Sequence, residues 1–209
     1  MQSSVLWNRE IILQQIHTRV AAACLAAFVA LPMVAPLACA VPEGAGLSKA
    51  DSTRMNQFEA ARVRGLGEAL LGTESRDRAL VSALFAPGIE PIDTLPDGNY
   101  RCRTIKLGGI LPLTAYTDFS CRISDGGTVI EKTSGSQRFT GTLTPSGDAL
   151  FFQGALHYND DPAGRYGADP EMDQVGCLYK VKDQAIYRLE KPYPLFESTH
   201  DVIELIPAN

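Results

Sequence analysis

Apolar side chains in residues 48–85 recur at helical spacing. Between Ser48 and Gly72 they return every three to four positions, which predicts an amphipathic helix. Ser48 with Asp51 three residues later resembles a capping box and marks its start, while Gly65 and Gly67 weaken its middle. A second short helix is expected over residues 74–85, before Pro87-Gly88. The apolar positions of the first helix are Met55, Phe58, Ala61, Leu66, Ala69 and Leu70.

After Pro96 the apolar period changes to two, which is typical of half-buried strands. About eight strands with short turns predict an antiparallel barrel or sandwich, and a closed barrel leaves no exposed edge. We therefore expect a mainly β fold: an antiparallel, lipocalin-like barrel of about eight strands, preceded by two helices. The expected strands are residues 99–106, 116–123, 128–132, 137–143, 149–157, 173–181, 184–189 and 199–206.

Two connections are longer than hairpin turns. Residues 107–115 are apolar and rich in glycine, and residues 158–172 are polar and rich in turn-forming residues. Long loops in small domains are often functional. We expect these two loops to border the mouth of the barrel.

The N-terminus has the pattern of a secretory signal peptide. Arg9 and Arg19 precede the apolar run AAACLAAFVAL (residues 21–31), and an A-x-A site ends at Ala40. The predicted organisation is a signal peptide (1–40), a linker with helices (41–96) and a barrel (97–209). An uncleaved anchor would need residues 20–42 to span a bilayer despite two prolines. A lipoprotein anchored at Cys39 would need an aliphatic residue where Pro36 stands.

The cysteines are consistent with export to the periplasm or beyond. Cys102 and Cys121 lie in strand-like stretches, where a disulfide would close a short loop. With Cys39 removed by cleavage, Cys177 is left over, and its apolar neighbours predict a buried, inert thiol. No C-x-x-C occurs and only His157 and His200 follow residue 40, so no metal site is expected.

The charge of the chain is mildly acidic. The net charge is −5, and residues 1–40 carry Arg9, Arg19 and Glu10, so the remainder carries −6. A general nucleic-acid binder needs a basic face, and we therefore expect no nucleic-acid partner.

Five sequence blocks together resemble a known family. They are CRTIKLGG (102–109), FSCRI (119–123), EKTSGSQR (131–138), YGADP with DQVG (166–176), and FES with DVIEL (196–205). Over residues 50–207 the chain is similar to the bacterial domain-of-unknown-function family 4893 of exported proteins. The resemblance implies no activity, and Cys177 departs from the aliphatic residue expected in that family.

No sequence motif supports an enzyme class. The chain has no G-x-S-x-G, H-E-x-x-H, P-loop or G-x-G-x-x-G motif, and no cofactor is expected. His157, at the end of an apolar strand, precedes Asp160 and Asp161, so a hydrolase using these three residues is the enzymatic alternative. A strand-end histidine at the barrel rim is the simpler interpretation.

The main functional hypothesis is a periplasmic binding or interaction module. Its partner would be a small molecule or an envelope protein, with no membrane span after cleavage; an envelope structural or inhibitory protein is a further alternative. Strand cations at Arg103, Lys106, Arg122, Lys132 and Arg138 would bind an anion where they share a face. The ligand-binding candidates are Lys106, Arg138, Tyr158, Arg165, Tyr166, Asp169 and Gln174.

Overall fold

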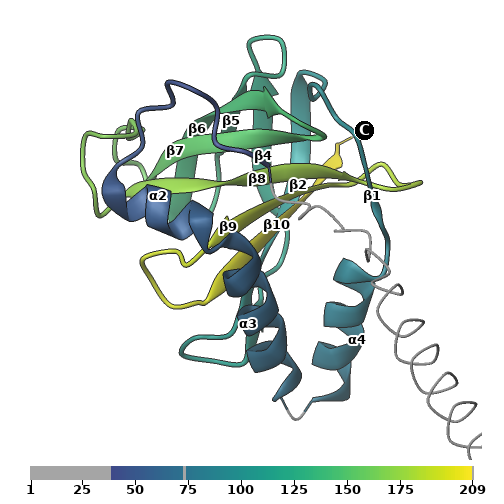
Figure 1. Cartoon of the computed structure of the whole chain (residues 1–209). Coiled ribbons are helices and arrows are strands. Elements are labelled where there is room, and N and C mark those ends of the chain that lie inside the picture. Colours follow the sequence, from purple (N-terminus) through teal and green to yellow (C-terminus); the bar gives the residue numbers. More distant parts are fainter. Residues whose placement is uncertain (1–38, 73, 209) are drawn as a thin grey trace, which may run out of the picture. The chain divides into compact units, whose positions relative to one another are not determined.

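Eight antiparallel strands close into a barrel in the computed structural model, which describes residues 39–72 and 74–208. Each barrel strand pairs with the next one along the chain, and the pairings of β8 with β9 and of β10 with β2 complete the ring. This confirms the predicted antiparallel barrel (Figure 1). The barrel strands are β2 (Gly98–Leu107), β4 (Phe119–Ser124), β5 (Val129–Lys132), β6 (Gln137–Ser146), β7 (Ala149–Tyr158), β8 (Asp173–Val181), β9 (Tyr187–Pro192) and β10 (His200–Pro207).

Two short strands lie outside the ring. β1 (Ile89–Glu90) pairs with β8, and β3 (Leu113–Ala115) pairs with β2. β3 forms within the glycine-rich connection 107–115 that was expected to be a loop. This connection therefore folds back along β2 and pairs with the last residues of that strand, Ile105–Leu107.

An apolar cluster fills one end of the barrel. Alternate residues point inward, because successive side chains of a strand point to opposite faces of the sheet. A disulfide between Cys102 and Cys121, with a Cα–Cα distance of 5.8 Å, joins β2 to β4 within this cluster. The buried members are Ile92, Leu95, Tyr100, Cys102, Cys121, Ile123, Ile130, Phe139, Leu143, Leu150, Phe152, Leu178, Tyr187, Leu189, Ile203 and Leu205.

The segment before β2 closes this end. Ile92 and Leu95 belong to the interior cluster although they precede the barrel strands. The carboxylate of Asp97 accepts hydrogen bonds from the amides of Gly126 and Gly127, at 3.0 and 2.7 Å, in the β4–β5 turn. The other end, where the β2–β4, β5–β6, β7–β8 and β9–β10 connections emerge, is the mouth of the barrel. Both long loops predicted to border the mouth begin at this end.

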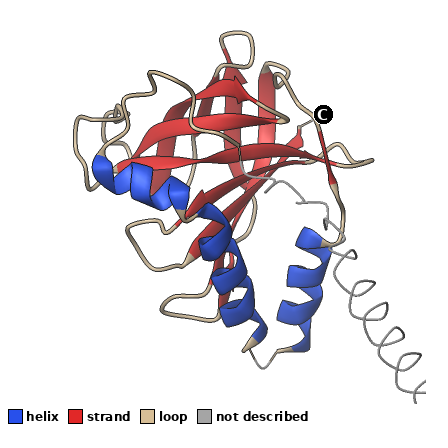
Figure 2. Cartoon of the chain, in the orientation of Figure 1, coloured by secondary structure: helices blue, strands red, loops and turns tan. Residues whose placement is uncertain are grey.

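Three helices of the described residues pack on the outside of the barrel, where the sequence predicted two (Figure 2). They are α2 (Lys49–Asn56), α3 (Phe58–Leu70) and α4 (Ser75–Phe85), and α2 begins as expected with Ser48 accepting a hydrogen bond from the Asp51 amide. The first predicted helix is interrupted at Gln57, whose φ and ψ are −103° and 15°. The interruption lets α2 contact β8 while α3 contacts β2, β9 and β10. No helix of the described residues is long and apolar enough to cross a membrane.

Helix α3 approaches the barrel wall closely at Gly65. A Cβ atom at this position would lie 2.9 Å from His200 Cβ and 3.3 Å from Leu107 Cβ. Gly67, two residues later, is exposed and has nothing within 4 Å of its Cβ position. Close packing against the barrel therefore explains the glycine at position 65. The glycine at position 67 makes no such contact and only lowers helix propensity.

A buried ionic cluster fastens α3 and α4 to the outer wall of the barrel. Glu190 Oε2 lies 2.9 Å from His200 Nε2 and 2.7 Å from Arg62 Nε, and Glu190 Oε1 lies 2.8 Å from Arg188 Nε. Arg188 also donates a hydrogen bond to the Leu84 carbonyl in α4. Burial acts to raise the pKa of Glu190, but His200, Arg62 and Arg188 hold it well below its usual range.

Residues 39–47, here called the strap, lie along the outside of β7 and β8. Cys39 forms a disulfide with Cys177, with a Cα–Cα distance of 5.7 Å. The expectation that Cys177 is an unpaired thiol is therefore wrong: its apolar surroundings belong to a buried disulfide, because Cys39 packs into the same cluster. The rest of the expected signal segment, residues 1–38, lies outside the described residues.

Candidate functional site

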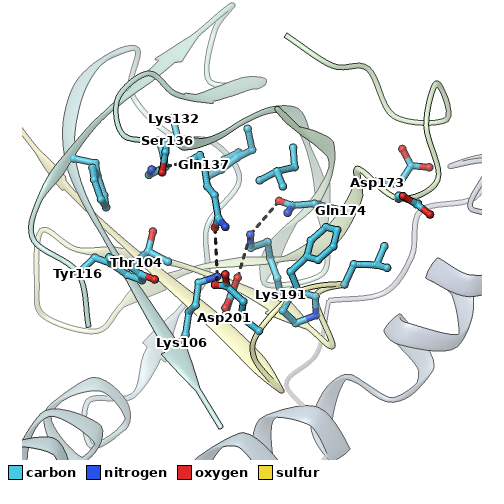
Figure 3. A pocket seen from close by; sticks show the side chains of 18 residues that line it. Thr104, Lys106, Tyr116, Lys132, Ser136, Gln137, Asp173, Gln174, Lys191 and Asp201 are labelled. Atoms are coloured by element: carbon cyan, nitrogen blue, oxygen red, sulfur yellow. Dashed lines mark hydrogen bonds and ion pairs between the residues drawn. The ribbon is translucent and has the colours of Figure 1, made fainter. Parts of the chain in front are cut away.

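A cavity of about 380 Å³ opens at the mouth of the barrel, above the apolar cluster. We call it the mouth pocket (Figure 3). Its polar lining consists of Thr104, Lys106, Tyr116, Lys132, Ser136, Gln137, Glu171, Asp173, Gln174, Lys191, Glu197 and Asp201, and its apolar lining of Phe119, Phe139, Leu156, Pro194, Leu195 and Phe196.

Strand alternation places the charged residues of the pocket inside the barrel. On β9, Lys191 follows Tyr187 and Leu189 on the inward face. On β10, Asp201 precedes the inward-facing Ile203, and on β2, Lys106 lies on the same face as Cys102. Each of these strands therefore changes from apolar to charged on its inward face as it reaches the mouth.

Lys191 lies in the middle of the pocket, between two partners. Its Nζ donates a hydrogen bond to Gln174 Oε1 at 3.0 Å and lies 3.5 Å from Asp201 Oδ2. Burial and the charge of Lys106 lower the pKa of Lys191, although Asp201 opposes the shift. Ser198 also donates a hydrogen bond of 2.6 Å to Asp201 Oδ1. The Asp201 carboxylate is thus shared between a lysine and a hydroxyl group.

Lys106 is better neutralised than Lys191. Its Nζ lies 2.7 Å from Glu197 Oε2 and 3.4 Å from Gln137 Oε1. Burial acts to lower the pKa of Lys106, but Asp201 and Glu197 outweigh it and raise the value above its ordinary 10.5. Lys106 therefore keeps its charge across the whole physiological range.

Lys132 is the buried cation of the pocket without a carboxylate partner. Its Nζ donates hydrogen bonds to the carbonyls of Ser134 and Gln137, at 2.9 and 2.6 Å, and stands 3.8 Å from the centre of the Phe119 ring. No carboxylate of the described residues lies within 4.0 Å of this nitrogen. Burial, with the charges of Lys191, Arg138 and Lys106, lowers the pKa of Lys132 to about 8. At neutral pH the group is still largely protonated.

Charge is distributed unevenly around the pocket. Three lysines and four carboxylates line it: Glu197 pairs with Lys106, Asp201 pairs with Lys191, and Glu171 and Asp173 are the other two carboxylates. In Figure 3 the side chain of Asp173 lies apart from the three lysines. Its carboxylate accepts a hydrogen bond of 2.8 Å from the Gly167 amide. The unevenness therefore lies at Lys132, which has no carboxylate of the described residues within 4.0 Å, whereas Lys106 and Lys191 each have one.

Glu68 of α3 holds the rim of the mouth in place. Its Oε2 accepts hydrogen bonds from Thr199 Oγ1, at 2.5 Å, and from the amide of Gly109, at 3.0 Å. The Thr199 hydroxyl, Arg64 and the Gly109 amide lower the pKa of Glu68 to about 2. One helical carboxylate thereby connects the β2–β3 and β9–β10 loops.

The structure distributes the predicted ligand-binding residues among several places. Lys106 and Gln174 line the mouth pocket. A smaller cavity of about 220 Å³ beneath the β7–β8 loop is lined by Tyr158, Arg165 and Asp169, among others. The remaining two, Arg138 and Tyr166, line neither cavity: Arg138 pairs with Asp160 at 3.1 Å, and the Tyr166 hydroxyl donates to Asp51 Oδ2 at 2.5 Å.

His157 lines the smaller cavity, and its neighbours differ from those of a catalytic dyad. Its Nδ1 lies 3.1 Å from the carbonyl oxygen of Asp161 rather than from a carboxylate. The side chain of Asp160, 94% exposed, pairs with Arg138. The three candidate hydrolase residues are therefore near one another in space, but the hydrogen bond of the histidine goes to the backbone.

The cations on neighbouring strands separate into two faces. Arg103 pairs with Glu204 and Arg122 pairs with Glu131 on the outside of the barrel, while Lys106 and Lys132 point inward. Sequence reasoning missed Lys191 and Asp201 as site residues. Lys191 lies beyond the expected end of its strand at residue 189, so the inward alternation was not followed far enough.

Comparison with known proteins gives one family match. The family model described as "Domain of unknown function (DUF4893)" matches residues 45–205. The match covers the strap from residue 45, the helices and nearly all of the barrel. A search of curated proteins and a search of solved structures found no match.

Proposed function

Because this chain belongs to the DUF4893 family, whose description assigns no activity, we propose a function from its pocket: an exported protein that binds a small organic anion. Two disulfides, Cys39–Cys177 and Cys102–Cys121, indicate an oxidising compartment outside the cytoplasm. The signal-peptide pattern of residues 1–40 supports export, and the periplasm is the proposed location.

The observation that carries the proposal is the environment of Lys132. A buried ammonium group is costly unless a charged or polar partner compensates for its lost hydration. Two carbonyls and an aromatic ring surround Lys132, and three other cations lower its pKa. A ligand carboxylate at this position would add the missing counter-charge, in a short charge-assisted hydrogen bond.

The size and the apolar walls of the pocket define the rest of the ligand. A volume of about 380 Å³ lies at the lower end of the range for small-molecule sites. Phe119, Phe139 and Leu156 offer apolar contact at the base, and Leu195 and Phe196 offer it at the rim. We therefore propose a monocarboxylate with a short aliphatic or aromatic body.

The two alternatives have weaker support. A hydrolase centred on His157 would need a carboxylate to orient the ring, and Nδ1 instead lies next to the Asp161 carbonyl. A structural or inhibitory envelope protein would use the exposed apolar side chains of Ile110 and Leu111 near the rim. Neither alternative explains the buried lysines of the mouth pocket.

Thermal unfolding with paired compounds tests the proposal. The full chain, purified after export, is unfolded with hexanoate or benzoate and, separately, with hexanamide or benzamide. Because a ligand that binds only the folded state raises the melting temperature, we expect both carboxylates to raise it and both amides to leave it unchanged. Equal shifts with acid and amide would contradict recognition of charge.

Two lysine variants assign the effect to the pocket. Lys132→Met removes the cation that lacks a carboxylate partner and should abolish the carboxylate shift. Lys180→Met removes an equal charge from a half-exposed ion pair with Glu90, where β8 pairs with β1 and outside the mouth pocket. This variant should preserve the shift. A carboxylate shift that survives Lys132→Met unchanged would reject the proposed binding position.

A further inference from the structure

The strap is attached to the barrel at several points besides its disulfide. Ser146 Oγ donates a hydrogen bond to the Ala40 carbonyl at 2.6 Å, and Gln153 Nε2 donates one to the Ala45 carbonyl at 2.9 Å. Cys39 itself is 6% exposed and packs in a cluster that contains Phe151 and Tyr179. Cys39 is thus an integral part of the folded domain rather than a residue of its margin.

A cut after Ala40 is incompatible with this arrangement. It would release Cys39 with the signal peptide and leave Cys177, which is fully buried, without its disulfide partner. It would also remove the Ala40 carbonyl that Ser146 contacts. Cleavage at the A-x-A site would therefore remove Cys39 and Ala40, both of which contact the barrel in the folded domain.

Lipid attachment at Cys39 is also incompatible with the disulfide. A lipoprotein carries its diacylglycerol on the sulfur of its first cysteine, through a thioether bond. The Cys39 sulfur is already bonded to Cys177, and Cys39 is buried in the cluster between the strap and the barrel. One sulfur cannot form both bonds, so a disulfide at Cys39 excludes an acyl anchor in the same molecule.

We propose that the exported chain is cut before Cys39, and that Cys39 remains in the mature protein as the disulfide partner of Cys177. Ala35 and Ala38 are the small residues available to precede such a cut. The bridge forms when the two thiols pass two electrons and two protons to a disulfide-bonded oxidoreductase, which becomes a dithiol. This inference rests on the proposed export of the chain but not on ligand binding.

The N-terminus of the exported protein tests the inference. The full-length chain is expressed in a bacterium, recovered from the periplasm without reductant, blocked with a thiol reagent, and analysed by intact mass and N-terminal sequencing. We expect a first residue at or before Cys39 and a mass lower by four hydrogen atoms than after reduction. Digestion without reduction should yield a peptide that joins Cys39 to Cys177.

The first residue of the chain and the state of its cysteines distinguish the alternative outcomes. A chain that starts at Val41, or one with a lipid on Cys39, overturns the retention of Cys39 and leaves export standing. A chain that still starts at Met1 overturns export itself. Molecules with Cys102–Cys121 bridged but Cys177 alkylated also overturn the proposal, because oxidation has then occurred without the second bridge.

A single-cysteine variant completes the test. In Cys39→Ser the cut should stay in the same place, and Cys177 should become the one cysteine of the barrel that is alkylated after unfolding without reduction. Cys102 and Cys121 serve as the internal control, since their bridge does not involve the strap. Alkylation of Cys177 to the same extent in the unaltered protein would contradict the proposed bond between Cys39 and Cys177.

Discussion

Lys191 and Asp201 are register partners on neighbouring strands, and their side chains meet inside the barrel with Nζ 3.5 Å from Oδ2. One residue before each of them, Glu190 and His200 meet on the outside of the same two strands, 2.9 Å apart. The β9–β10 wall therefore lines the mouth pocket with one face and fastens α3 with the other. A change in either pair tests one face of this wall.

Removing the carboxylate of the inner pair should destabilise the protein and strengthen anion binding. Asp201→Asn leaves Lys191 and Lys106 without the charge that they share, and breaking a buried pair typically costs about 3–5 kcal/mol. We expect a loss at the lower end of this range in urea unfolding. In the same variant, benzoate should raise the melting temperature more than it does in the unaltered protein.

Glu131→Gln is the matched control for the Asp201 variant. It removes a carboxylate from an ion pair with Arg122 on the outside of the barrel. Exposed pairs contribute at most about 1 kcal/mol, so both stability and the benzoate response should stay close to their original values. Equal losses in the two variants would show that the inner pair has no special role.

The lowered pKa of Lys132 predicts how stability depends on pH. Its pKa is about 8 in the folded protein against an ordinary 10.5, so folding disfavours the protonated form. The penalty is full below pH 8, declines as pH rises from 8 to 10.5, and is absent above that, a change of roughly 3 kcal/mol. Lys132→Met should remove this contribution, so the variant's free energy of unfolding minus that of the parent should fall by roughly 3 kcal/mol as the pH rises through that window in urea titrations.

Anion binding should follow the same group in the opposite direction. Only protonated Lys132 offers a counter-charge, so the affinity for benzoate should be constant below pH 8 and fall above it. The fall can reach about tenfold per pH unit where one proton is taken up on binding. Calorimetry in buffers of different ionisation enthalpy would detect that proton; an affinity that does not change across this range would separate binding from Lys132.

The two glycines of α3 should respond to alanine with opposite signs. Gly65→Ala places a Cβ 2.9 Å from His200 Cβ, and crowding of this kind typically costs about 1–3 kcal/mol. Gly67→Ala meets nothing within 4 Å and should gain up to about 1 kcal/mol from helix propensity. Thermal unfolding of both variants decides this, and a gain in both would mean that α3 does not press on the wall at Gly65.

Each disulfide should contribute measurably to stability. The Cys102–Cys121 bridge spans 19 residues, for which loop closure predicts roughly 3 kcal/mol, and the Cys39–Cys177 bridge spans 138 residues, for which it predicts roughly 5 kcal/mol. Paired alanine substitutions, unfolded in urea, should follow that order. Reduction should weaken the parent but leave the quadruple variant unchanged, which controls for the packing of the lost sulfur atoms.

The barrel could be predicted from the sequence because period-two alternation continues through its strands. The break at Gln57 could not, since helical spacing persists across it and only the contacts of α2 and α3 with different strands reveal the change of direction. The second disulfide was hidden by the A-x-A pattern, which assigned Cys39 to the discarded segment. In both cases the outcome depended on contacts between residues far apart in the sequence, which a local pattern does not contain.

The site was only partly predictable for a related reason. Lys106 and Gln174 were singled out, but the significance of Lys132 and Lys191 depends on which side chains face them across the barrel, and that requires the ring to be closed. In sequence, Lys191 precedes a proline-containing stretch that reads as a turn. Buried charge is a property of the closed barrel and has no signature in a single strand.

Ile92 and Leu95 pack into the far end of the barrel and close it. In the part of the chain that the structure describes, the interior therefore opens to solvent at the mouth alone. A molecule that enters between the loops must leave by the same route. A solute bound in the mouth pocket would therefore exchange with the solvent through the mouth alone.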